Sequence, residues 1–100
     1  MTEVTKPSRL IVAPESRLKM PRHIKLRHDE GRNKWLILAP ERVFEPDDIS
    51  VEVLKLCDGE RTVSDIAEKL AADYQAPADV ILTDITAMLQ ELADKGVLKS

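Results

Sequence analysis

The sequence predicts an α+β fold in which a small three-stranded antiparallel sheet is followed by three helices. Residues 21–45 contain an alternating polar and apolar stretch and a short apolar run, separated by turn residues, which is the pattern of short strands. Residues 47–95 place apolar side chains three or four apart between helix-capping residues. The last two helices, with the extended segments beside them, are therefore expected to resemble a winged helix-turn-helix in one domain of 100 residues.

The strands are separated by recognisable turns. The first begins at Pro21 and alternates as far as His28, and the turn at 29–32 leads into a second strand at Lys34–Leu38. That strand is apolar on both faces, which suits a central strand or one that meets a partner. A break at Ala39-Pro40-Glu41 precedes the short third strand, Arg42–Glu45, which Pro46 ends because proline has no N–H to donate.

The three helices are bounded by capping residues. They are predicted at 47–57, 63–74 and 77–95. Asp47 or Asp48 caps the first helix, and Gly59 is expected to end it in a left-handed conformation. Thr62 and Asp65 have the spacing of a capping box for the second. Residues 97–99 are a candidate terminal strand.

The N-terminal part differs from the rest. Residues 1–16 contain two prolines and no clear period, so they are expected to form a flexible tail, with the folded domain spanning 17–100. The apolar patch Leu10–Val12 leaves a second reading open, in which it pairs as an extra strand.

The distribution of charge disfavours binding to DNA. Residues 1–45 carry ten Lys and Arg against six Asp and Glu, whereas residues 46–100 carry five against twelve. The stretch between Leu70 and Asp94 has no Lys or Arg, so its helix lacks the cations that contact phosphates. No apolar run is long enough to span a membrane. A lone cysteine, Cys57, fits a reducing, cytoplasmic setting.

No set of residues predicts catalysis. His23 and His28 fall on opposite faces of a strand, which argues against a shared metal site. Cys57 lies on the apolar side of its helix, where a buried hydrophobe is the ordinary reading and a nucleophile would need a nearby base. The isolated glycines form no phosphate-binding loop. A binding module without metal or cofactor is therefore expected.

Three segments resemble the PqqD family, small proteins of pyrroloquinoline quinone (PQQ) biosynthesis. They are PRHIKLRHDEGRNKWLILAPERVFEPD at Pro21–Asp47, LCDGERTVSDIA at Leu56–Ala67 and LQELADKGVL at Leu89–Leu98. The resemblance covers roughly four-fifths of the chain and excludes the first sixteen residues. Pro46 is a departure, because the family more often has an apolar residue or another non-proline there, and it shortens the third strand.

The resemblance implies a peptide chaperone that is not an enzyme. Members of the family bind the precursor peptide PqqA, which adds a strand beside the third strand, and present it to the radical S-adenosylmethionine enzyme PqqE. The residues implied for the ladder are Arg42, Val43, Phe44 and Glu45; those for the helix side are Ile81, Asp84, Ile85 and Met88. From spacing alone, Ile85 fits the core better than the groove.

Two other functions remain open at this point. The first is a DNA-binding winged-helix protein, and the second is a small catalytic or cofactor-binding protein. The oligomeric state is also open between a monomer and a homodimer. The apolar faces of Trp35–Leu38 need cover, and the short hinge at 39–41 would allow the hairpin to be exchanged between copies.

Overall fold

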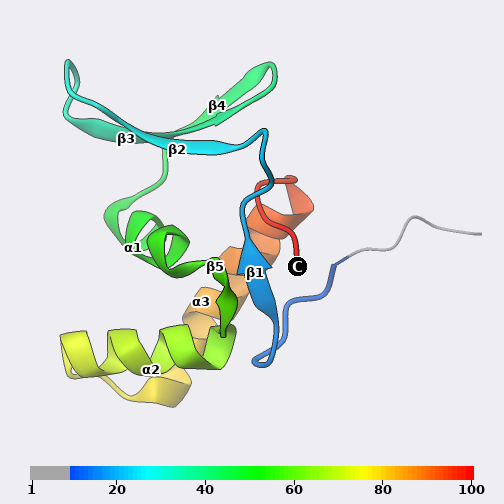
Figure 1. The fold of residues 1–100 in the computed structure, drawn as a ribbon. Coiled ribbons are helices and arrows are strands. Elements are labelled where there is room, and N and C mark those ends of the chain that lie inside the picture. The colour runs from blue at the N-terminus through cyan, green and yellow to red at the C-terminus, as the bar shows by residue number, and fades with distance from the viewer. Residues whose placement is uncertain (1–9) are drawn as a thin grey trace, which may run out of the picture.

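The computed structural model describes residues 10–100, and it confirms the α+β class. A three-stranded sheet lies across one end of a body of three helices, and a second, two-stranded sheet runs through that body (Figure 1). The elements are β1 (Arg17–Lys19), β2 (Lys25–Asp29), β3 (Lys34–Ala39), β4 (Arg42–Phe44), α1 (Asp48–Leu56), β5 (Asp58–Thr62), α2 (Val63–Tyr74) and α3 (Ala78–Asp94).

The larger sheet has the order β2-β3-β4, so the doubly apolar strand β3 is central as predicted. On its inner face Ile37 is buried between Leu26 of β2 and Phe44 of β4. On its outer face Leu36 and Leu38 are half-buried. The first strand predicted from the sequence corresponds to β2, which begins at Lys25 rather than at Pro21. The chain turns at residues 21–24, where the N–H of Ile24 donates to the carbonyl of Pro21 at 3.0 Å.

The smaller sheet was not predicted. In it β1 pairs antiparallel with β5, and residue 17 lies opposite residue 62. Helix α1 is capped by Cys57, so Gly59 does not end it as expected but lies in β5 with a φ of 83°. The candidate strand at 97–99 is present as a single bridge, in which Lys19 and Lys99 exchange two backbone hydrogen bonds of 2.8 Å.

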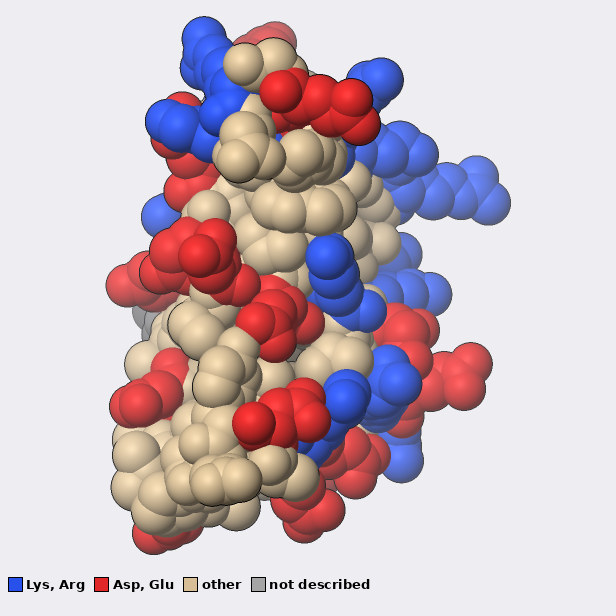
Figure 2. All heavy atoms as spheres, turned by 90° about the vertical axis from the view of Figure 1, so that its left-hand side faces the viewer, with Lys and Arg blue, Asp and Glu red and all other residues tan. Residues whose placement is uncertain are grey.

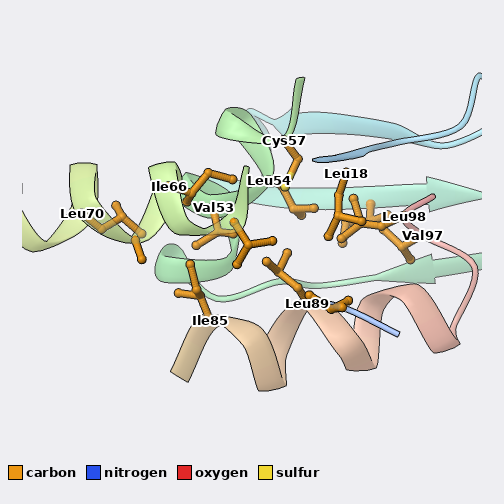
Figure 3. Packing of buried hydrophobic residues seen from close by; sticks show 14 of the residues in the cluster. Leu18, Val53, Leu54, Cys57, Ile66, Leu70, Ile85, Leu89, Val97 and Leu98 are labelled. Carbon is orange, nitrogen blue, oxygen red and sulfur yellow. The ribbon is translucent and has the colours of Figure 1, made fainter. Parts of the chain in front are cut away.

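The helices enclose the core. The capping box is confirmed, since Thr62 accepts from the N–H of Asp65 and Asp65 accepts from that of Thr62, each at 3.0 Å. In the close view of Figure 3, α3 contributes Ile85 and Leu89, which are 2% and 0% exposed. Other elements contribute Leu18, Val53, Leu54, Cys57, Ile66, Leu70, Val97 and Leu98. Within residues 10–100, no helix is long and apolar enough to cross a membrane.

The segment at 10–16 is packed on this body, so the folded unit extends beyond the boundary expected at residue 17. Val12 is only 6% exposed, and the side-chain amide of Gln90 in α3 holds the backbone around it. Gln90 accepts from the N–H of Val12 at 2.9 Å and donates to the carbonyl of Leu10 at 2.8 Å. The rest of the expected tail, residues 1–9, lies outside the described residues.

The Gln90→Leu variant is expected to be less stable by about 1–3 kcal/mol, because two partly buried backbone groups lose their partners. Hydrogen exchange at the Val12 amide should become faster, and urea unfolding would give the loss of stability. Thr83→Ala, which removes only a hydroxyl bonded within α3, is the control. Unchanged exchange at Val12 would show that Gln90 does not hold this segment.

Candidate functional site

A groove of about 460 Å³ separates β4 from the C-terminal half of α3. One wall is β4 and the residues after it, from Val43 to Asp47. The opposite wall is α3, and Ile37 and Ser50 contribute to the lining between them. Segments some 40 residues apart in the sequence therefore meet here. The groove is partly open to solvent and one of its walls is a sheet-edge strand, a combination that suits an extended chain.

The strand wall has an unpaired edge. Strand β4 is the last strand of its sheet, with β3 on one side only. It is joined to β3 by the two-residue turn Pro40–Glu41, and the pair next to the turn is Ala39 with Arg42. Glu41 has a φ of 63°, the left-handed conformation that the third residue of a type II turn requires after proline. The other edge of β4 leaves backbone donors and acceptors available for pairing.

The helix wall is one face of α3. Met88, Glu91, Leu92 and Lys95 line the groove, and their spacing of three, four and seven residues places them on one side of the helix. The side chain of Ser50 at the start of α1 donates to the sulfur of Met88 at 3.3 Å, which ties this wall to α1. The wall therefore offers an adaptable thioether and a leucine, together with one acidic and one basic side chain, Glu91 and Lys95.

Charge is divided along the groove. At one end, the guanidinium carbon of Arg42 lies 5.0 Å and the Lys95 ammonium 5.8 Å from the ring centre of Phe44. At the other end Asp47 caps α1, its carboxylate accepting from the N–H of Ser50 at 2.8 Å. Between these ends Glu45 forms a 3.5 Å ion pair with Lys34. The groove thus has a cationic end and an acidic end.

The structure brings together five of the eight residues expected at a peptide site. Val43, Phe44, Glu45 and Met88 line the groove, and Arg42 lies against the ring of Phe44. The other three, all in α3, do not line it. Ile85 is buried in the core, Ile81 is half-buried against it, and Asp84 is exposed.

The helix half of the expected site is therefore displaced by one to two turns. Helix α3 packs against α2, and the α3 residues that line the groove beside β4 all lie in its C-terminal half. Sequence reasoning missed Glu91, Leu92 and Lys95, although their spacing from Met88 was a signal that could have found them.

A second hollow of about 230 Å³ adjoins the acidic end and shares Glu45 and Pro46 with the groove. Trp35 lines it, with the ammonium of Lys55 4.4 Å from its ring centre and the ring of His28 5.1 Å away. His28 is thus accounted for as a packing partner. Among residues 10–100, no cluster of three or more His, Cys, Asp or Glu could hold a metal ion.

The acidic character of the helical end is visible on the surface. The face in Figure 2 shows no Lys or Arg at the lower left, where α2 ends and α3 begins. The whole of α3 contains no Lys or Arg, but it carries Asp79, Asp84, Glu91 and Asp94. In a DNA-binding winged-helix protein the corresponding helix approaches the phosphates of DNA, and the acidic helix α3 would repel them.

Comparison with known proteins points to one family. Residues 34–98 match the family model described as coenzyme PQQ synthesis protein D (PqqD). A PqqA binding protein of Bradyrhizobium diazoefficiens is 59% identical over 92 residues, which are 92% of this chain and 89% of the relative.

Two solved structures are also similar. The PqqD truncation of Methylobacterium extorquens PqqCD, solved by solution NMR and described as a functional, stand-alone recognition element for ribosomally synthesised and post-translationally modified peptides, has a TM-score of 0.78 and 47% identity. The match covers 89% of this chain and 95% of that one. The crystal structure of PqqD from Xanthomonas campestris has a TM-score of 0.58 and 32% identity, covering 100% and 99% of the two chains.

The cysteine is placed for packing rather than for chemistry, which leads to a prediction for alkaline pH. Burial, and secondarily the charge of neighbouring Asp58, raise the pKa of the Cys57 thiol from 9.0 to about 12. An unfolded chain would release this proton first, so the free energy of unfolding should fall as pH rises from about 9 towards 12. Urea unfolding at about pH 8 and pH 10.5 should show less of this fall in Cys57→Ala. An identical pH dependence in both proteins would contradict a buried thiol.

Proposed function

This chain belongs to the PqqD family, whose members are non-catalytic peptide-binding proteins, and from that premise we propose that it binds the precursor peptide PqqA as a strand added to β4. It then presents the peptide to the radical S-adenosylmethionine enzyme PqqE. A reducing, cytoplasmic setting belongs to the same proposal, because the single cysteine is buried and unpaired.

The observation that carries the proposal is the unpaired edge of β4 beside the groove. Backbone pairing along such an edge gives affinity for any extended peptide, and the side chains that line the groove give specificity. From Arg42 to Asp47 the wall can accompany roughly four to six residues of peptide, the usual length of a strand. Strand β2 also has an open edge, but it lines neither the groove nor the hollow at Trp35.

The phase of the β3–β4 hairpin identifies the backbone groups that would pair. The residues that flank a two-residue turn exchange hydrogen bonds, and the next pair does not. Arg42 therefore bonds inward to β3, whereas Val43, opposite Leu38, directs its N–H and C=O towards the open edge. Val43 is 61% exposed, so the rest of residues 10–100 leaves this position of the strand accessible.

A homodimer, which is the alternative to a monomer, would use the other side of the sheet. Leu36, Leu38 and Val43 share its outer face, where a second copy would cover them. A monomer and a hairpin-swapped homodimer both stay open as predictions. A DNA-binding role has no support in α3, which carries no cation.

The Val43→Pro variant should bind PqqA at least roughly tenfold more weakly, because proline removes the N–H that faces the edge. Val43→Ala keeps that N–H and is the matched control. Isothermal titration gives both affinities, and amide spectra of the free proteins show whether each is folded. In the wild-type protein, added peptide should shift the amides of Val43, Phe44 and Glu45. Shifts confined to β2 and its turn would rule out pairing at β4.

Truncating the helix wall should also weaken binding. Met88→Ala is expected to reduce the affinity for PqqA by about 1 kcal/mol or more, since it removes apolar contact from the groove. Val80→Ala shortens an exposed apolar side chain on the same helix but outside the groove, so its affinity should match that of the wild type. Equal losses in the two variants would point to an effect on α3 as a whole.

A further inference from the structure

We propose that Arg42 and Lys95 bind a carboxylate side chain of the docked peptide and so fix the direction in which the peptide lies in the groove. This inference rests on the proposed function, because it assigns a specificity to the same groove. It concerns the end of the groove at which β4 begins and α3 finishes. Phe44 lines the groove there, and the two cations come from opposite walls.

The two cations converge on one aromatic ring. Both lie within 6 Å of the ring centre of Phe44, at 5.0 Å for Arg42 and 5.8 Å for Lys95. Phe44 is half-buried, whereas both cationic residues are exposed. The ring face attracts the cations and holds them near the mouth of the groove, while their remaining N–H groups still point to solvent or to a ligand.

Neither cation has a carboxylate partner in the part of the chain that the structure describes. The ion pairs there join Arg32 to Asp29, Lys34 to Glu45, Arg61 to Asp58, and Lys69 to Asp73. The groove residue Glu91 lies one helical turn before Lys95 but forms no ion pair with it. Two cations that contact one ring and have no carboxylate partner among the described residues leave this end of the groove positively charged, and a peptide carboxylate would neutralise it.

The opposite end of the groove excludes the same ligand. Asp47 lines that end, and the hydrogen bond from the backbone N–H of Ser50 lowers the pKa of its carboxyl, so it is ionised at neutral pH. Asp48 follows it in the first turn of α1, and Glu91 lies midway along the helix wall. A peptide carboxylate would be repelled at these positions and attracted only at the Arg42 end.

This distribution of charge gives the groove a direction. In an antiparallel ladder, the C-terminal end of the added strand lies beside the first residue of β4, which is Arg42. An acidic residue near the C-terminal end of the bound segment would therefore meet the cations. The same peptide in the parallel orientation would bring that residue to Asp47.

The test is a double-mutant cycle measured by isothermal titration. Arg42→Gln and Lys95→Gln keep the backbone of each wall and remove the charge. PqqA is titrated unchanged and as a set of peptides in which each Asp or Glu is replaced singly by Asn or Gln. Arg27→Gln, on the outer face of β2, is the matched control. Thermal unfolding of each variant checks that the groove is still folded.

Each of the two substitutions should weaken binding of unchanged PqqA by about three- to tenfold, and Arg27→Gln should not. One of the amide-substituted peptides should bind the wild-type protein as weakly as unchanged PqqA binds the Gln variants. The same peptide should bind the Gln variants no more weakly than it binds the wild type. The inference is overturned if both variants bind unchanged PqqA as the wild type does, or if no single acidic residue of the peptide couples to them. Absence of binding by the wild type would instead overturn the proposed function.

Discussion

Helix α3 has three faces, and each is in contact with a different part of the chain, so its position determines the geometry of the site. Ile85 and Leu89 hold it in the core. The face that carries Met88 and Lys95 forms a wall of the groove, and Gln90, almost directly opposite Met88 on the helix, holds the N-terminal segment. The groove depends on this arrangement because β4 contributes only one wall, and a helix that moved would leave the strand edge without its neighbour.

Local signals in the sequence were enough to predict most elements. The capping box at Thr62 and Asp65, the turn at Pro40, and the short apolar run of β3 each lie within a few residues, and each appears in the structure. Strands β1 and β5 could not be found in this way. Strand β5 is polar and contains Gly59, and it exists because it pairs with a segment some 40 residues earlier in the chain.

The candidate site likewise has one half that local sequence signals predict and one half that depends on distant packing. Its strand half could be predicted, because a proline-bounded strand after a tight turn is an edge by its own sequence. Its helix half could not, because periodicity gives the apolar arc of α3 but not the turn at which that arc passes β4. The packing of α3 on α2 and the core fixes that crossing, which is why Ile81, Asp84 and Ile85 do not line the groove while Glu91, Leu92 and Lys95 do.

The side-chain amide of Gln90 pairs with the backbone of residues 10–12 much as a neighbouring strand would, because it donates one hydrogen bond and accepts another. The chain therefore enters the domain on the flank of α3 that faces away from β4. A tag or an enzyme domain joined ahead of this segment would begin on the side remote from the groove. The recognition surface could then be tethered to a larger protein by its leading end without obstructing its own ligand.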